Sequence, residues 1–252
     1  MNISFCGAGF LGIYHMGVLK ALRSSAPKFL SRIERVGGAS AGSLAGVVLV
    51  CEPEKVEECT QFNLALSDEV RRKPLGSFTP NYNLLDSVRA FIDSTLSHDA
   101  HHRANGILYI SLTSFDGRSL PKNTVVSKYT SRDELIQCLI SSCYIPGYIG
   151  LAPPKIDGKF QTDGGLTNNL ITFPDGRTVT VSPFSGHQDI CPKDDIGRNM
   201  HVHMKNQTFR VNQKNGARAV HAMFPPSRDV LVRYFEQGYS DAMVFVMTEK
   251  LS

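Results

Sequence analysis

The apolar positions of the chain follow two periods, one typical of buried strands and one typical of amphipathic helices. Continuous apolar runs predict strands at residues 2–6, 31–36, 106–115 and 177–184, with residues 123–129 as a neighbouring strand. Apolar residues three to four positions apart predict helices at residues 12–23, 53–72, 84–96 and 131–145. Residues 37–51 predict a glycine-rich turn leading into a helix of small residues. Strands alternating with helices favour an α/β fold whose sheet is largely parallel and carries helices on both faces.

The length and composition fit one globular domain spanning residues 1–252. Apolar residues make up 42% of the chain and charged residues 20%, and no repeat or low-complexity linker divides it. The net charge of +4 allows weak attraction to anionic surfaces but gives no reason to expect nucleic acid binding. The basic cluster Arg71–Lys73 suits either a solvated loop or contact with lipid headgroups.

Cysteine usage and the apolar runs indicate the compartment. The six cysteines form no CxxC pair and no disulfide framework, which favours reduced thiols in the cytoplasm. The N-terminus shows no signal-peptide pattern, and the longest apolar runs, such as the one from Leu44, are too short to cross a membrane. We therefore expect any contact with membranes to be peripheral.

A glycine-rich turn follows the first predicted strand. Gly7, Gly9 and Gly12 fit the spacing G-x-G-x-x-G, which suits a pyrophosphate or any other anion at a helix N-terminus. A dinucleotide-binding fold also needs an acidic residue at the end of its second strand. Here that strand ends in Val36 and two glycines, with Glu34 inside it, so the nucleotide interpretation is weak.

The second turn, Gly38 to Gly42, reads GASAG and matches G-x-S-x-G. A serine nucleophile needs a tight turn between a strand and a helix, and its neighbours must be small for the backbone to pass so closely. The strand before Ser40 and the helix after it are both predicted. Glycine and alanine at such a turn also suit close packing without chemistry, so this motif alone leaves both readings open.

The third turn contains Asp163, Gly164 and Gly165. The carboxylate follows a short predicted strand, and the two glycines permit close approach of another backbone. Asp163 suits a general base, but it equally suits an Asx-type turn in which it caps its own loop. In an open α/β sheet, however, sites form at the carboxyl ends of strands, and all three turns lie at such ends.

The turns GAGFLG, GASAG and DGG, in this order, resemble the patatin-like phospholipase family, and CGAGFLGIYHMGV is most similar to its adipose triglyceride lipase and adiponutrin branch. The resemblance runs from Ile3 to the C-terminal end and implies a three-layer α/β/α patatin-like fold. It implies a dyad of Ser40 as nucleophile and Asp163 as general base. It further implies an oxyanion hole of Gly7, Ala8 and Gly9. No metal or cofactor is implied.

The chain has eight histidines, and one of them could act with a serine and an aspartate in a Ser–His–Asp triad. His98, His101 and His102 cluster in a polar stretch that suits a solvated loop better than a metal site. His201 and His203 alternate as strand residues do. No histidine has a context that requires a catalytic role, so a triad stays possible but unsupported.

The resemblance implies a serine lipid acyl hydrolase that cleaves acylglycerol esters. The expected activity is that of a triacylglycerol lipase, with phospholipase activity as a further option. Residues 143–154 are apolar and aromatic and suit an acyl-chain groove, although they equally suit a packed core. The helix at 84–96 suits a lipid surface less well than packing on the sheet. A lipid-droplet or membrane surface and a protein coactivator are the partners that the family implies, and larger relatives carry a C-terminal region that directs them to droplets.

Two alternatives remain open at the level of sequence. A lipid transacylase would use the same Ser40 and Asp163 and differ only in passing the acyl group to an alcohol instead of water. A catalytically weak protein of lipid droplets could keep the fold without the activity. An oxidoreductase is disfavoured because Ser40 stands where the dinucleotide fold needs an acid.

Overall fold

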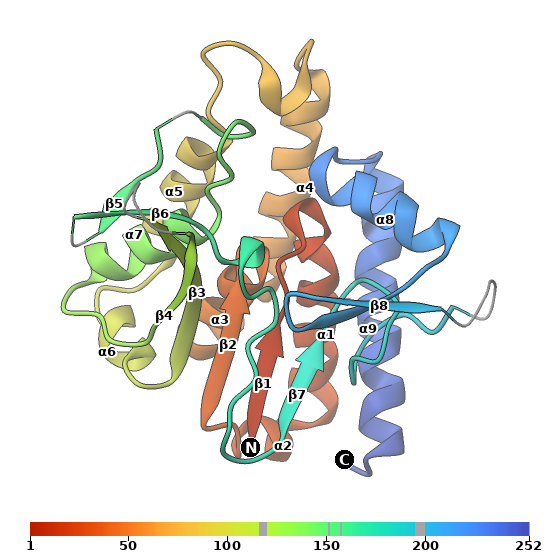
Figure 1. Ribbon diagram of the computed structural model, residues 1–252. Helices are drawn as coiled ribbons and strands as arrows, with labels where there is room; N and C mark the ends of the chain where they lie inside the picture. Colours follow the sequence, from red (N-terminus) through yellow and green to blue (C-terminus); the bar gives the residue numbers. More distant parts are fainter. Residues whose placement is uncertain (116–119, 151, 157, 195–199, 252) are drawn as a thin grey trace.

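A seven-stranded sheet frames the fold in this computed structural model, which describes residues 1–115, 120–150, 152–156, 158–194 and 200–251 (Figure 1). The strand order is β5-β6-β3-β2-β1-β7, and β4 also pairs with β3. The strands are β1 (Asn2–Phe5), β2 (Arg35–Ala39), β3 (Leu108–Phe115), β4 (Lys122–Val126), β5 (Lys155–Ile156), β6 (Lys159–Asp163) and β7 (Thr178–Val181).

The centre of the sheet is parallel and one side of it is antiparallel. Strands β7, β1, β2 and β3 run parallel, whereas β4 and β6 pair antiparallel with β3, and β5 pairs antiparallel with β6. All four residues of β1 are buried, as expected for a parallel strand covered on both faces. The predicted mixed α/β class with a largely parallel central sheet is confirmed.

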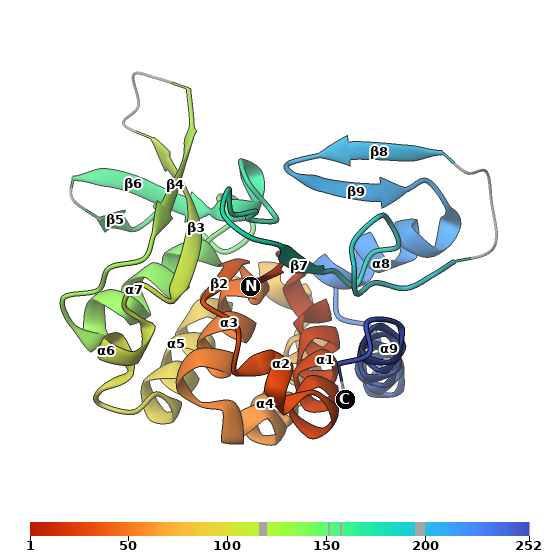
Figure 2. The ribbon, with the colours of Figure 1, turned by 90° about the horizontal axis from the view of Figure 1, so that it is seen from below.

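Helices gather mainly on one face of the sheet, where Figure 2 shows α1 to α6. The helices are α1 (Gly12–Ser25), α2 (Pro27–Leu30), α3 (Ala41–Cys51), α4 (Val56–Arg72), α5 (Leu84–Thr95), α6 (Ala100–Ala104), α7 (Arg132–Ser142), α8 (Gln213–Met223) and α9 (Arg228–Thr248). Short 3-10 turns are η1 (Gly9–Leu11), η2 (Pro53–Lys55), η3 (Gly76–Phe78) and η4 (Gly164–Leu166). On the opposite face, the chain between η4 and β7 packs Phe173 against Tyr109.

The C-terminal helix α9 lies along α1 so closely that glycines are needed at both contacts. A Cβ at Gly17 would lie 2.0 Å from the carbonyl oxygen of Phe235, and one at Gly238 would lie 2.1 Å from that of Tyr14. The Tyr14 hydroxyl donates a hydrogen bond to Asp241 at 2.7 Å. Because α1 begins at the glycine-rich turn, α9 supports the helix that carries this turn.

The helix predicted at 84–96 forms as α5, but its partners differ from the expected ones. Its apolar face is buried, yet it packs on α4 and α7 rather than on the sheet. The rings of Phe62 on α4 and Phe91 on α5 stack with centroids 3.9 Å apart. This arrangement leaves space between α3, α4 and α5, which the site uses.

The other sequence expectations can be placed on the fold. His201 lies in strand β8 (His201–Met204), which pairs with β9 (Gln207–Arg210) in a separate hairpin, as the alternation of His201 and His203 indicated. His101 and His102 lie in the short helix α6 instead of a loop. Within the described ranges, no cluster of His, Cys, Asp or Glu is arranged to hold a metal ion, and no helix has the length and apolar character to cross a membrane.

Candidate active site

Ser40 stands on a strained turn between β2 and α3. Its backbone has φ +52° and ψ −129°, a conformation that L-residues adopt only when the surroundings enforce it. A Cβ at Gly38 would lie 2.4 Å from the carbonyl oxygen of Gly42, and one at Gly42 would lie 2.1 Å from that of Phe5. The two glycines of GASAG therefore serve the close passage that a nucleophile turn requires.

Two further serines hold this turn in place. The Ser40 N–H donates to the hydroxyl of Ser142 at 2.8 Å, and that hydroxyl donates to the carbonyl of Ser111 on β3 at 2.8 Å. The Ser43 hydroxyl donates to the Ser40 carbonyl at 2.7 Å. Ser142 was not predicted from the sequence, because nothing in the pattern of α7 distinguishes it from other serines near a helix end.

Asp163 lies at the end of β6, which runs antiparallel to β2, the strand that leads into Ser40. In the sheet register, Ala39 on β2 faces Ser111, and Asp163 at the end of β6 faces Leu112. The ends of β2 and β6 thus flank the same point of β3. A Cβ at Gly164 would lie 2.1 Å from the Ser111 carbonyl oxygen, so only glycine can follow Asp163 at this point.

The Asp163 carboxyl is buried and carries an altered acidity. Burial raises the pKa of Asp163 to about 6, while hydrogen bonds from the Ser40 side chain and the Gly165 N–H lower it. The Gly165 N–H donates to Asp163 Oδ1 at 2.7 Å, so the Asx-type turn considered from the sequence is present as well. A carboxyl group beside the Ser40 hydroxyl, with a pKa near neutrality, is suited to accept its proton.

The glycine-rich turn lies beside these two residues. Gly9 has φ +51°, and a Cβ there would lie 2.1 Å from the carbonyl oxygen of Ala222 on α8. In the described part of the chain, the N–H groups of Ala8 and Gly9 donate to no protein acceptor. A Cβ at Gly12 would lie 3.0 Å from that of Ala41, so α1 begins against the residue that follows Ser40.

Asn169 fixes the position of Gly7. The Gly7 N–H donates to Asn169 Oδ1 at 3.0 Å, and Asn169 Nδ2 donates to the Gly7 carbonyl at 3.4 Å and to Gln207 on β9 at 2.5 Å. The Gly7 N–H is therefore occupied, and among the three predicted oxyanion-hole residues the free N–H groups are those of Ala8 and Gly9. Asn169 was not predicted from the sequence, although it stands only four residues after the DGG turn.

Cys143, which the sequence placed only in a candidate acyl-chain groove, also lies beside Ser40 and Asp163. Burial and the charge of Asp163 raise the pKa of its thiol well above the usual range, although a hydrogen bond with Ser40 lowers it. The thiol thus stays protonated at neutral pH and is a poor nucleophile. The raised pKa of the Cys143 thiol therefore favours Ser40 over Cys143 as the reacting side chain.

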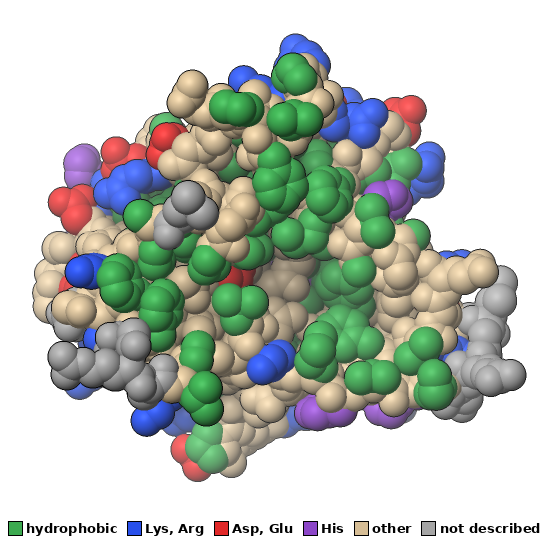
Figure 3. Space-filling model, turned by 45° about the horizontal axis from the view of Figure 1, so that its top comes forward, with side chains coloured by type: hydrophobic (Ala, Val, Ile, Leu, Met, Phe, Trp, Pro, Cys, Tyr) green, Lys and Arg blue, Asp and Glu red, His purple; other side chains and the backbone are tan. Residues whose placement is uncertain are grey.

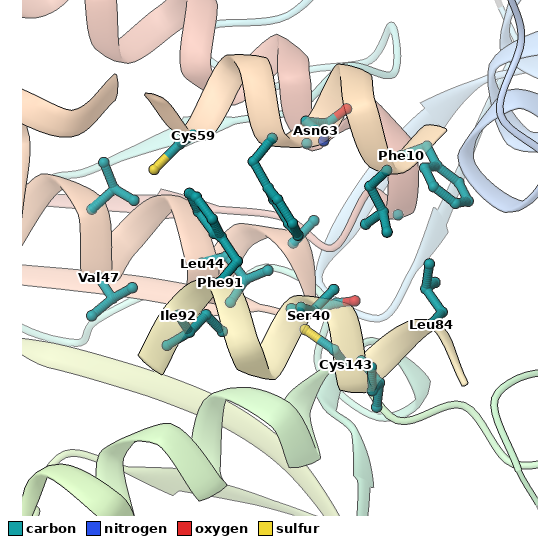
Figure 4. Close-up of a pocket in the computed structure, with 18 of the residues that line it drawn as sticks. Phe10, Ser40, Leu44, Val47, Cys59, Asn63, Leu84, Phe91, Ile92 and Cys143 are labelled. Atoms are coloured by element: carbon teal, nitrogen blue, oxygen red, sulfur yellow. The ribbon is translucent and has the colours of Figure 1, made fainter. Parts of the chain in front are cut away.

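An apolar cavity of about 160 Å³ opens beside Ser40 (Figure 4). Its walls come mainly from α3, α4 and α5, including Leu44, Val47, Cys59, Phe62, Leu66, Leu85, Val88, Phe91 and Ile92. Of the predicted groove at 143–154, the residues Cys143, Ile145, Tyr148 and Ile149 line it, while Leu151 lies outside the described residues. In Figure 4, Ser40 lies toward Phe10 and Leu84, while Val47 and Ile92 lie at the other side.

No histidine lines this cavity within the described part of the chain. His15 lies nearest in sequence to the glycine-rich turn, and its Nε2 is 2.9 Å from the carbonyl oxygen of Cys6. Complete burial lowers the pKa of His15 to about 4. His15 thus contacts the backbone that enters the turn and does not line the cavity beside Ser40.

Known proteins are similar to this chain over nearly its whole length. The sequence profile of the family described as Patatin-like phospholipase matches residues 3–174. The chain is 39% identical to human patatin-like phospholipase domain-containing protein 4 over 249 residues, covering 99% of this chain and 97% of that protein.

Longer relatives match over about half of their length. The chain is 41% identical to mouse patatin-like phospholipase domain-containing protein 2, covering 97% of this chain and 50% of that protein. It is 37% identical to human omega-hydroxyceramide transacylase, covering 97% of this chain and 45% of that protein. The fold is similar to that of VipD from Legionella pneumophila, with a TM-score of 0.53 and 11% identity over 98% of this chain and 66% of that one. The chain belongs to the patatin-like phospholipase family.

Proposed function

We propose that this chain is a serine lipid acyl hydrolase that cleaves the ester bonds of acylglycerols through an acyl-enzyme on Ser40. The observation that carries the proposal is a serine on a strained turn, beside a buried carboxyl of raised pKa, at the wall of an apolar cavity. An acyl chain fits such a cavity, because it offers apolar walls and only a few polar groups beside the reacting atoms.

The reaction would proceed in two steps. Ser40 Oγ attacks the ester carbonyl carbon while Asp163 accepts its proton, and the N–H groups of Ala8 and Gly9 stabilise the charge that forms on the carbonyl oxygen. The C–O bond then breaks, the leaving alcohol takes the proton from Asp163, and the acyl group stays on Ser40. Water, deprotonated by Asp163, then attacks the acyl-enzyme, the bond between the acyl carbon and Ser40 Oγ breaks, Ser40 takes the proton back from Asp163, and the fatty acid leaves. One such N–H donor contributes about 3 to 4 kcal/mol to the transition state.

A transacylase is the second candidate, supported by the relative that is named omega-hydroxyceramide transacylase. It would share the first step, and an alcohol would replace water in the second. Acylglycerol specificity and the role of a droplet or membrane surface belong to the proposal and rest on the family.

Labelling with a fluorophosphonate probe tests the nucleophile. We expect wild type to be labelled and to release fatty acid from a triacylglycerol emulsion, and Ser40→Ala to do neither while keeping its circular dichroism spectrum. Labelling of Ser40→Ala, or its absence in folded wild type, would contradict the proposal. Adding an alcohol acceptor and separating the acyl products then distinguishes hydrolysis from transfer.

A further inference from the structure

Two exposed aromatic side chains lie beside the cavity, and we call them the apolar rim. Phe78 is 48% exposed and Phe224 is 53% exposed. The Phe78 ring lies 5.2 Å from that of Tyr148, which lines the cavity, and 6.2 Å from that of Phe224. The apolar rim therefore continues the cavity wall onto the surface.

The segments that carry the apolar rim are tied together beneath it. The Tyr148 hydroxyl donates to the carbonyl of Met223 at the end of α8 and lies 3.0 Å from the Ser77 hydroxyl in η3. The connection from α4 to α5, the loop with Tyr148 and the end of α8 thus meet at one point. A fixed, contiguous group of exposed aromatic side chains on a monomer indicates a binding surface.

Two arginines stand beside the apolar rim without an acidic partner. Arg71 donates to the carbonyl of Pro225, next to Phe224, at 3.0 Å, and Arg72 donates only to the carbonyl of Asp68 on its own helix. In the described residues neither forms an ion pair. Figure 3 shows green hydrophobic side chains gathered on this end of the molecule, with blue Lys and Arg side chains along their border.

We propose that the apolar rim docks on an anionic phospholipid surface. Phe78 and Phe224 would enter the acyl region, and the guanidinium groups of Arg71 and Arg72 would meet headgroup phosphates, which Arg binds with paired hydrogen bonds. Docking in this orientation places the mouth of the cavity on the lipid. The inference rests on the proposed function for its purpose, but the binding itself requires no catalysis.

Vesicle flotation tests the apolar rim, with vesicles of phosphatidylcholine alone or mixed with phosphatidylserine. The variant Phe78→Ser/Phe224→Ser should lose roughly tenfold or more of its binding to mixed vesicles, because two aromatic side chains no longer leave water. Arg71→Gln/Arg72→Gln should weaken binding to mixed vesicles only, by about fivefold per arginine. The matched control is Val244→Ser/Met247→Ser on α9, two exposed apolar residues near the C-terminus, at the other end of the molecule (Figure 1).

A second readout avoids dependence on disruptive variants. The chain contains no tryptophan, so Phe78→Trp introduces a single indole, whose emission should shift to the blue on mixed vesicles, whereas that of Val244→Trp should not. Equal flotation of the rim variant and wild type, or loss of a self-associated dimer instead of vesicle binding, would overturn the inference. Hydrolysis of a soluble short-chain ester by every variant is measured alongside. Its absence throughout would count against the proposed function and leave the docking result standing.

Discussion

Asn169 pairs with both sides of the Gly7 peptide, accepting from its N–H at 3.0 Å and donating to its carbonyl at 3.4 Å. It also comes within reach of the turn that carries Asp163, since a Cβ at Gly165 would lie 2.7 Å from Asn169 Oδ1. One amide side chain thus sets the spacing between the glycine-rich turn and the turn of Asp163.

Replacing this amide should slow catalysis without removing any reacting group. We expect Asn169→Ala to lower kcat by about tenfold to a hundredfold with a smaller effect on KM, because the donors of the oxyanion hole lose their alignment. The matched control is Asn168→Ala, whose side chain bonds Asn123 and Asn206 instead. Steady-state kinetics on a soluble ester decides the matter, and equal effects of the two substitutions would contradict a positioning role.

The acidity of Asp163 predicts the pH profile. With a pKa of about 6, the carboxylate is the active form above that pH and is progressively protonated below it. We therefore expect kcat/KM on a soluble ester to rise about tenfold per pH unit below pH 6 and to level off above it. The rate of fluorophosphonate labelling should follow the same curve. A midpoint near the ordinary aspartate pKa of about 3.9 would show that burial does not act as described.

The same pKa predicts that Asp163 lowers stability. Because the pKa is raised from 3.8 to about 6, the folded protein binds this proton more tightly than the unfolded chain does. Stability therefore decreases as pH rises through this interval, and the ionised carboxylate costs on the order of 3 kcal/mol at pH 7. Asp163→Asn should abolish hydrolysis and raise the melting temperature by several degrees at pH 7.5.

Measurements at low pH provide the control for this effect of Asp163→Asn on stability. Near pH 4 the wild-type carboxyl is protonated in the folded state, so the advantage of Asp163→Asn should become small. Calorimetry at both pH values measures the difference. An advantage of the same size at both would assign it to packing rather than to charge.

The far side of the cavity predicts a selectivity for acyl chains. Figure 4 shows Ile92 and Val47 away from Ser40, where the end of a long chain would lie. Ile92→Phe should lower kcat/KM for long-chain esters at least tenfold relative to a butyrate ester, because the added ring fills space that only long chains use. The control is Val232→Phe, which places the same ring on the exposed side of α9. Equal loss on all chain lengths would contradict this orientation of the acyl chain.

The turns could be predicted from the sequence because their steric demands are local. Gly38, Gly42 and Gly164 are each required by a backbone within 2.4 Å of a hypothetical Cβ, and such demands are visible as short motifs. The strand of Asp163 was expected, but its antiparallel direction depends on pairing with β3, which sequence periodicity does not encode. The roles of Ser40 and Asp163 themselves stay a prediction until a variant is assayed.

Other features depend on partners far apart in sequence. Asn169 gains its role from Gly7, 162 positions away, and Ser142 from Ser40, 102 positions away. Helix α9 was not predicted, and its few buried residues include Gly238, which weakens the helical pattern although the contact with α1 requires it. The apolar rim likewise unites η3 and the end of α8, which no local pattern connects.

The close approach of Gly9 to Ala222 determines how much polypeptide an intact site needs. The family profile ends at Pro174, after both Ser40 and Asp163, yet α8 contacts the glycine-rich turn and α9 supports α1. A fragment cut at residue 174 would keep the reacting groups and lose the segments that hold their surroundings. Excision or domain grafting should therefore carry the chain through Thr248, and split halves should regain activity only when the C-terminal half is supplied.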